Sequence, residues 1–163
     1  MSEVLEIGDM LSKLVEPKRQ FRWTMSFNDM IDSFTLRTAN RPQVAFEDTT
    51  VDYMNTKFYY PGKATWEPLT LTLLDPLVPS AAQKTIEWLR LVYEAETGRM
   101  GYKAFLAKTI NLKMLDPVGA VAEEWEIINA WPQTINWGEL DYSVSDPVNI
   151  TVTLRFDFAT LSF

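Results

Sequence analysis

Residues 149–158 read NITVTLRFDF, and this stretch decides the class of fold. Apolar side chains occupy every second position: Ile150, Val152, Leu154, Phe156 and Phe158. Polar side chains occupy the positions between them: Asn149, Thr151, Thr153, Arg155 and Asp157. Successive side chains of a strand point to opposite faces, so a period of two predicts a strand with one buried face. We expect the apolar set to face a core and the polar set to face away from it.

The same period of two recurs in other segments of the chain. It is clearest at residues 69–73, where leucine alternates with threonine, and at residues 21–27, where apolar and polar side chains alternate. Weaker strand patterns cover residues 34–39, 43–60, 105–115 and 121–130. The sequence therefore predicts a mainly β protein of antiparallel strands.

One segment, residues 80–97, has the spacing of a helix instead. Ser80 and Gln83 form a capping-box sequence, and Gly98 stands where a helix commonly ends. Apolar residues recur at intervals of three and four: Ala82, Ile86, Leu89 and Tyr93, with Trp88 and Val92 beside them. Such a stripe packs one side of a helix against a sheet. The predicted fold is an antiparallel β-sandwich or barrel with one flanking α-helix at about residues 80–97.

The composition limits the possible chemistry. The chain has 163 residues, of which 47% are hydrophobic, so it fits one domain with a hydrophobic core. It contains no cysteine and no histidine, which excludes disulfides, thiolate nucleophiles, histidine bases and the commonest zinc ligands. Neither a Gly-rich phosphate loop nor a GxSxG motif is present. We therefore predict no catalytic residue, no cofactor, no metal site and no enzymatic activity.

The chain is acidic, with a formal net charge of -7 from 22 acidic and 15 basic residues. Proteins that read nucleic-acid sequence normally present a basic face, so this charge argues against that class. The first residues carry acids at Glu3, Glu6 and Asp9, where a secretion signal would carry positive charge. No apolar run approaches the roughly 20 residues that span a bilayer. We expect synthesis in the cytoplasm and no insertion of the subunit into a membrane.

Three glutamates on a predicted strand offer an alternative function. Glu124 and Glu126 share one strand face, and Glu123 shares the other face with Trp125. A carboxylate pair beside an aromatic side chain would suit a glycoside hydrolase. A solvated strand face is the simpler interpretation, because neither fold nor composition establishes catalysis.

The six tryptophans offer a second alternative. Trp23, Trp88 and Trp125 stand at positions that face the predicted core. Trp66, Trp131 and Trp137 stand near turns, where a carbohydrate-binding β-sandwich could use them as a stacking platform. Packing in a core or an interface is the commoner use of such residues.

Residues 53–66, YMNTKFYYPGKATW, hold five aromatic and two basic side chains and no acid. Pro61-Gly62 is a turn signal, so we predict a hairpin whose turn lies there. Aromatic side chains are typical anchors at the centres of protein interfaces. The hairpin is therefore the candidate contact surface of this chain.

From residue 51 to residue 73 the chain resembles the tail tube proteins of contractile-tailed, T-even type bacteriophages. The shared elements are Met54-Asn55 with Lys57, a glycine turn and an alternating Thr/Leu strand. Further pieces match in the same order: Gln83-Lys84 with Trp88, Trp131-Pro132 with Gly138-Glu139-Leu140, and the final strand. The resemblance covers nearly the whole chain from about Phe21. The same family serves related contractile injection systems.

The resemblance implies a tail-tube β-sandwich at residues 19–163, an N-terminal arm at residues 1–18 and an inter-subunit hairpin at about residues 51–66. Six copies would form a ring around a lumen, and stacked rings would conduct DNA during ejection. The implied partners are the tail sheath protein, baseplate and tail-terminator proteins and, transiently in the lumen, tape-measure protein and DNA. The implied location is the virion, after assembly in the cytoplasm of the host bacterium. The tube of a toxin-delivery system that carries protein cargo is the alternative.

The resemblance also assigns roles to individual residues. The residues expected between subunits or rings are Tyr53, Asn55, Phe58, Tyr59, Tyr60 and Trp66. Lys57 and Lys63 would meet acids of the next copy, namely Glu47, Asp48 and Asp52. The residues expected to face the lumen are Thr151, Thr153, Arg155 and Asp157. Because six acidic chains meet in one ring, a lumen wall that repels phosphate is a further hypothesis.

Overall fold

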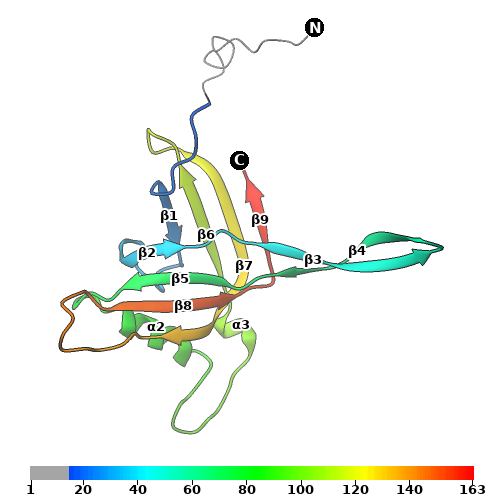
Figure 1. Cartoon of the computed structure of the whole chain (residues 1–163). Helices are drawn as coiled ribbons and strands as arrows, with labels where there is room; N and C mark the ends of the chain where they lie inside the picture. The colour runs from blue at the N-terminus through cyan, green and yellow to red at the C-terminus, as the bar shows by residue number, and fades with distance from the viewer. Residues whose placement is uncertain (1–14) are drawn as a thin grey trace.

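Two antiparallel sheets form the body of the protein in the computed structural model, which describes residues 15–163 (Figure 1). Sheet A contains β1 (Trp23–Ser26), β6 (Lys108–Leu115), the first half of β7 (Val121–Asn136) and β9 (Phe158–Ser162). Sheet B contains β2 (Leu36–Ala39), β5 (Leu69–Leu74), β8 (Asn149–Arg155) and the second half of β7. The predicted mainly β fold with antiparallel sheets is confirmed. Most of the predicted arm at residues 1–18 falls outside the described residues.

Strand β7 belongs to both sheets because it bends in its middle. Residues 121–130 pair with β6 and in part with β9, whereas residues 131–136 pair with β8. Between these parts Asn129 has φ 55°, a left-handed conformation that asparagine tolerates better than most residues. The bend carries the chain from one sheet into the other.

The core lies between the two sheets and receives the side chains that alternation assigns to it. The fully buried residues of sheet B are Leu71, Leu73, Ile150, Val152 and Leu154, and those of sheet A are Met25, Ile110, Ile127 and Ala130. Full burial of one such side chain stabilises the fold by about 1.5–3 kcal/mol. Ile150, Val152, Leu154 and Phe156 are buried as predicted, whereas Phe158 is 46% exposed. The strand itself is shorter than predicted, because it breaks after Arg155 and Phe158 begins β9 in the other sheet.

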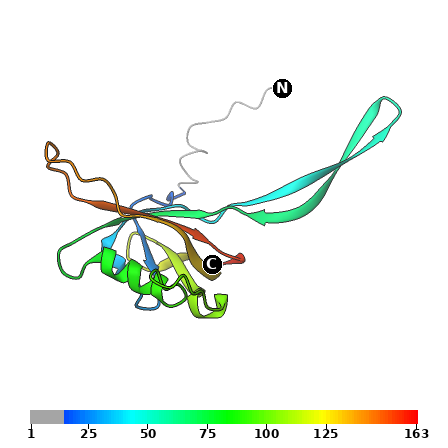
Figure 2. The same cartoon turned by 90° about the horizontal axis from the view of Figure 1, so that it is seen from below.

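Helix α2 (Ala81–Arg90) starts where the sequence predicts. The Ser80 hydroxyl accepts a hydrogen bond from the Gln83 N–H at 3.3 Å. Asp75 adds a second cap, because its Oδ1 accepts from the N–H groups of Ala81 and Ala82 at 3.0 and 3.2 Å. The indole of Trp88 is fully buried and donates to the Leu106 carbonyl at 2.8 Å. Figure 2 shows α2 on the same side of sheet B as sheet A, so the helix closes one end of the sandwich.

The predicted end of this helix at residue 97 is wrong. Helix α2 ends at Arg90, and the chain then forms a loop in which Tyr93 bridges Met100. Gly98, with φ 68°, lies in the turn of that loop and donates its N–H to the Glu94 carbonyl at 2.8 Å. Val92 lies in the turn that ends the helix, where its N–H donates to the Leu89 carbonyl, and Tyr93 then enters the bridge, since tyrosine favours extended backbone. The short helix α3 (Lys103–Leu106) follows, and no helix within residues 15–163 is long and apolar enough to cross a membrane.

Strands β3 (Val44–Tyr53) and β4 (Thr56–Trp66) form a hairpin that projects from the sandwich (Figures 1 and 2). The structure has the predicted hairpin, but its turn is at Met54-Asn55 and not at Pro61-Gly62. Pro61-Gly62 lies inside β4 at a bulge, where Gly62 and Lys63 oppose the single residue Glu47. A Cβ atom on Gly62 would lie 2.8 Å from the Glu47 carbonyl oxygen. The Pro-Gly pair therefore lies in a bulge, which favours the same residue types as a turn.

Candidate assembly surfaces

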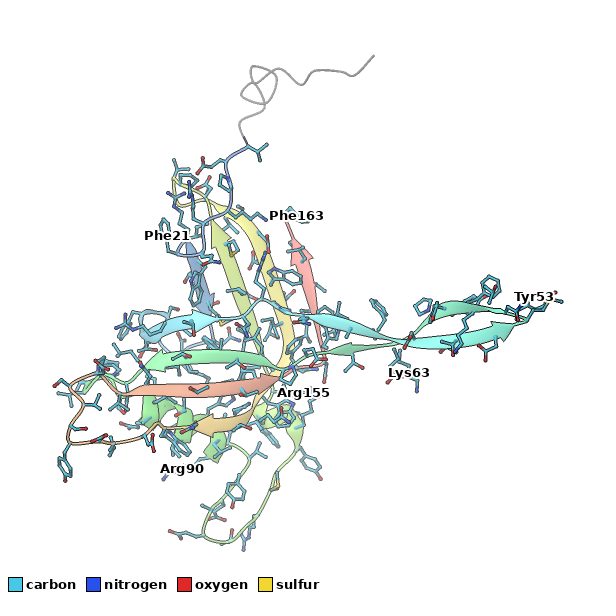
Figure 3. The ribbon with its side chains drawn as sticks, in the orientation of Figure 1. Phe21, Tyr53, Lys63, Arg90, Arg155 and Phe163 are labelled. Atoms are coloured by element: carbon cyan, nitrogen blue, oxygen red, sulfur yellow. The ribbon has the colours of Figure 1, made fainter. Side chains whose placement is uncertain are left out.

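The projecting hairpin has no core of its own. Every residue of β3 and all of β4 except Trp66 are exposed, and Tyr59 retains 66% of its surface. Figure 3 shows Tyr53 at the tip of the hairpin and Lys63 along its length, both away from the sandwich. An isolated two-stranded hairpin is at best marginally stable in water. A ribbon that is long, aromatic and unsupported has the properties of a surface that another chain covers.

The outer half of the hairpin has one apolar face. Val51 is paired with Phe58, Thr49 with Tyr60, and Tyr53 with Thr56. Alternate pairs share a face, so Tyr53, Val51, Phe58 and Tyr60 lie together. The opposite face carries Asp52 with Lys57, Thr50 with Tyr59, and Asp48 with Pro61. Tyr59, expected in the same role as Phe58 and Tyr60, therefore lies on the other side of the ribbon.

The apolar face changes sides at the bulge. Between the bulge and the sandwich, Val44 pairs with Trp66 and Phe46 with Ala64. By register these pairs continue the face of Asp52 and Lys57, not the face of Phe58. Trp66 packs against Phe156 with ring centroids 5.8 Å apart, and this contact fixes the base of the hairpin to the body.

The charged residues of the hairpin face each other within one chain. Asp52 is the direct cross-strand neighbour of Lys57, and Lys63 lies in the bulge opposite Glu47. No ion pair within 4.0 Å joins residues of the hairpin in the part of the chain that the structure describes. Each of the two lysines thus lies opposite an acid of its own chain without forming an ion pair with it, so its ammonium group is available to another chain.

Sheet B is open at both edges. Its strands run in the order β7, β8, β5, β2, and neighbouring strands are antiparallel. Within residues 15–163 no strand pairs with the outer edge of β2 or with the outer edge of β7 beyond residue 130. The Asn40 N–H bonds to the Thr70 carbonyl at 3.3 Å, so by alternation the N–H of Ala39 points away from β5. These unpaired edges can accept another strand.

Within residues 15–163 no helix or strand covers the face of sheet B opposite the core (Figure 2). Thr151 and Thr153 lie on it, as the sequence predicts for residues that alternate with the buried set. Arg155 lies at its margin beside Trp131, its partner across β7 and β8 (Figure 3). Asp157 follows the end of β8, where it accepts hydrogen bonds from Lys103 at 2.6 Å and from Asn129 at 2.8 Å. These bonds, that from Lys103 foremost, hold the pKa of Asp157 below its usual range.

Glu123 corrects the expectation of a solvated strand face. Its side chain is only 4% exposed and forms an ion pair with Lys18. Trp125 donates its indole N–H to the same carboxylate at 2.5 Å, and Arg41 Nη1 lies 3.7 Å away. The hydrogen bond from Lys18 is the main reason that the pKa of Glu123 is lowered, against the opposing effect of burial. Alternation placed Glu123 and Trp125 on one strand face, but it had no signal for Lys18 and Arg41, which are distant along the chain.

The glutamate pair does not resemble a hydrolytic site. Glu124 forms an ion pair with Lys113 at 3.5 Å, and Glu126 is exposed on the same strand face. Within residues 15–163 no three acidic side chains gather as a metal site would require.

The three turn-associated tryptophans do not form one platform. Trp66 and Trp131 line a shallow depression together with Arg155 and Phe156. Trp137 lies six residues further along the chain, roughly 20 Å at strand rise. It donates its indole N–H to the Thr85 hydroxyl of α2 at 3.3 Å. The arrangement therefore lacks the joint stacking surface that sugar binding would require.

Comparison with known proteins gives a consistent result. The family described as T4-like virus tail tube protein gp19 matches residues 21–160. A tail tube protein of Serratia phage KSP90 is 25% identical over 169 residues, which cover 96% of this chain and 95% of that protein.

Solved structures share the fold at low sequence identity. The sheath-tube complex of an extracellular contractile injection system (PVC) has a chain with TM-score 0.72 and 14% identity, covering 98% of this chain and 99% of its own. A chain of the anti-feeding prophage tube-terminating cap has TM-score 0.73 and 18% identity, covering 91% and 93%. Hcp1 from Flavobacterium johnsoniae has TM-score 0.54 and 12% identity, covering 86% and 94%.

Proposed function

The chain belongs to the T4-like virus tail tube protein family, and from this premise we propose that six copies form a ring and that rings stack into a tube. Membership makes the chain a structural tube subunit of a virion or phage-like particle, not an enzyme. The observation that supports the ring is sheet B, which is open at both edges. An even number of alternating strands lets β7 of one copy pair antiparallel with β2 of the next.

A closed ring of sheets has the dimensions of a conduit. Six copies contribute six times four strands, 24 in all. At a spacing of about 4.8 Å and a tilt of about 40°, the barrel has a backbone diameter of about 48 Å. Side-chain layers of about 5 Å on each wall leave a lumen of roughly 38 Å. A lumen of that width admits a DNA duplex, and we propose that it conducts DNA.

The hairpin is proposed to join one ring to the next. Its longer strand has 11 residues. At about 3.3 Å per residue that strand spans roughly 36 Å, enough to reach beyond its own ring. The apolar face with Phe58 and Tyr60 would supply the buried centre of the contact, and Tyr53 and Asn55 its tip. Tyr59 and Trp66, on the opposite face, would meet a different neighbour.

The charged residues of the hairpin would set register rather than strength. Lys57 and Lys63 are proposed to meet Glu47, Asp48 and Asp52 of the next copy while keeping their own cross-strand neighbours. Exposed ion pairs contribute little free energy, but they penalise wrong alignments.

The remaining partners are proposed from the kind of particle that the family builds. They are the tail sheath protein, baseplate and tail-terminator proteins, and tape-measure protein inside the lumen. Structural relatives come from a sheath-tube complex and a tube-terminating cap, which supports such neighbours. The same relatives come from injection systems, so a tube that carries protein cargo is the second candidate. Genes for a capsid and a DNA-packaging motor beside the coding sequence would favour the phage tail.

Negative-stain electron microscopy of the Ala39→Pro variant tests the ring. Proline removes the N–H that points outward from β2 and leaves the bonds to β5 in place. We expect a folded subunit with unchanged circular dichroism that forms neither rings nor tubes. The control is Ala39→Ser, which keeps the N–H and is expected to assemble as wild type. Rings of Ala39→Pro would contradict the proposed pairing of β2.

A further inference from the structure

The middle of the free face of sheet B is made of threonine and asparagine, and Leu74 and Arg155 lie on the same face at the ends of their strands. Register places the threonine and asparagine residues in two rows across the strands. One row consists of Thr38, Thr72, Thr151 and Asn136, and the other of Thr70, Thr153 and Thr134. No member of either row is charged, although the chain carries a formal charge of -7. The acidity of the protein therefore lies elsewhere.

Two acids that follow these strands are turned to other uses, whereas Glu139 and Asp146 are exposed in the loop between β7 and β8, outside the rows. Asp75 follows β5, and its carboxylate caps helix α2. Asp157 follows β8, and its carboxylate is held by Lys103 and Asn129. At the margins lie two arginines, Arg37 in the irregularity of β2 and Arg155 at the end of the β7 and β8 pairing. Neither arginine interrupts the rows.

We propose that the two rows form an uncharged, hydroxyl-lined band of the lumen wall, which selects cargo by width and not by charge. The inference rests on the proposed function, because it takes sheet B as the inner barrel. It replaces the hypothesis of an acidic wall that repels phosphate.

The chemistry of the rows suits the passage of a polyanion. A basic wall would hold phosphates by releasing their counterions, and an acidic wall would oppose their entry. Threonine hydroxyls and asparagine amides hold water through hydrogen bonds and carry no net charge. Salt screens charges beyond about 8 Å at physiological ionic strength, so acids on the outer surface of a tube do not reach the lumen. A cargo of either net charge would therefore contact water held by these groups and no charged side chain of the rows.

Single cysteines test this inference, because the chain contains none. Thr151→Cys places a thiol in the centre of the rows. Val118→Cys is the control, in the turn between β6 and β7 and 87% exposed. In tubes verified by electron microscopy, a maleimide polymer wider than the lumen should label Val118→Cys and spare Thr151→Cys. In the unassembled Ala39→Pro background it should label both.

The sign of the electrostatic potential at the wall is measured with small charged thiol reagents. Cationic and anionic methanethiosulfonates of similar size react with Thr151→Cys in tubes and in the Ala39→Pro background. A wall potential of one kT per unit charge would change the ratio of their rates by about sevenfold on assembly. We expect this rate ratio to change by less than about threefold on assembly. When Thr153→Asp is added to Thr151→Cys, the change should be larger and should favour the cationic reagent.

Each outcome decides a different point. Absence of tubes would overturn the proposed function and this inference with it. Tubes in which the polymer labels Thr151→Cys would show that sheet B faces outward, and would overturn the lumen assignment alone. Tubes with a protected thiol and a rate ratio changed by threefold or more would overturn the neutrality of the wall. A protected thiol with a nearly constant ratio supports it.

Discussion

At the scale of single residues, Glu123 joins three separate parts of the chain. Lys18 precedes β1, Arg41 lies in the link between β2 and the hairpin, and Trp125 lies on β7. All three direct a donor or a positive charge at one carboxylate. The carboxylate therefore links the segment before β1 and the segment before the hairpin to β7.

The Glu123→Gln variant should be less stable in a manner that depends on pH. The pKa of Glu123 is lowered in the folded state, so its stabilisation is present above the unfolded pKa of about 4.3 and is lost as pH falls through the folded value. We expect a loss of about 1–2 kcal/mol at pH 7 that disappears well below pH 4. Thermal unfolding at several pH values measures it.

The control for this variant is Glu124→Gln. Glu124 pairs with Lys113 at 3.5 Å on a half-exposed face, so its loss should cost less than about 1 kcal/mol. A destabilisation of Glu123→Gln that stayed constant from pH 7 to pH 3 would show that the charge of the carboxylate is irrelevant.

The Gly62→Ala variant should separate folding from assembly. The added methyl would lie 2.8 Å from the Glu47 carbonyl oxygen, which forces the two strands apart at the bulge. We expect unchanged thermal unfolding, because the hairpin lies outside the core, and a marked loss of tubes in electron micrographs. Ala64→Gly, a change of the same size two residues away, serves as the control and should still polymerise.

At the scale of elements, the hairpin gains stability only from a partner. Its outer half presents an apolar face with Val51, Phe58 and Tyr60 and an opposite face with Asp52 and Lys57. The sandwich, in contrast, buries most of the apolar residues of sheet B in its own core. We therefore propose separate roles for the two elements: the sandwich in the stability of the subunit and the hairpin in contact between copies.

A shortened hairpin should give rings that do not stack. Thr49 and Tyr60 are cross-strand neighbours, so Asn-Gly in place of residues 50–59 joins them with a two-residue turn. We expect the melting temperature of wild type and single rings in electron micrographs. Long tubes of this variant would contradict the inter-ring role of the hairpin.

Two serine variants test which face of the hairpin carries the contact. Phe58→Ser alters the apolar face and Tyr59→Ser the opposite face. If Phe58 is a central anchor worth about 2 kcal/mol, its loss raises the critical concentration for tubes roughly thirtyfold. We expect a smaller increase for Tyr59→Ser, measured by sedimentation. Equal effects would mean that both faces are buried to the same degree.

At the scale of the whole molecule, assembly brings together chains of like charge. Each subunit carries a formal charge of -7, so a ring concentrates negative charge and repulsion opposes its closure. The paired edges and the apolar face of the hairpin have to outweigh that repulsion. In the proposed ring, the uncharged rows of sheet B would reduce it at the inner wall.

Raising the salt concentration should therefore favour tubes. Between 20 and 200 mM sodium chloride the Debye length falls from about 20 Å to about 7 Å, which weakens repulsion between subunits. We expect the critical concentration measured by sedimentation to fall. If it rose instead, ion pairs of Lys57 and Lys63 with acids of the next copy would dominate the assembly.

The sequence determined the strands and their buried faces. Alternation fixes which side of a strand is apolar, and burial of Leu71, Val152 and Leu154 follows directly from it. The start of α2 was also predictable, because the Ser80 cap is a local interaction. The hairpin was predictable for the same reason, because its aromatic residues and its Pro-Gly pair all lie in one continuous segment.

Only the tertiary structure decided the turn of the hairpin, the end of α2 and the environment of Glu123. Pro61-Gly62 satisfies a turn and a bulge equally well, and the choice depends on the strand that lies opposite. The apolar residues that follow Arg90 are compatible with a longer helix or with an extended segment. The bridge between Tyr93 and Met100 selects the extended segment. Glu123 is buried by Lys18 and Trp125, one of them 105 residues away. Local patterns determine local structure, whereas distant contacts select among the structures that those patterns allow.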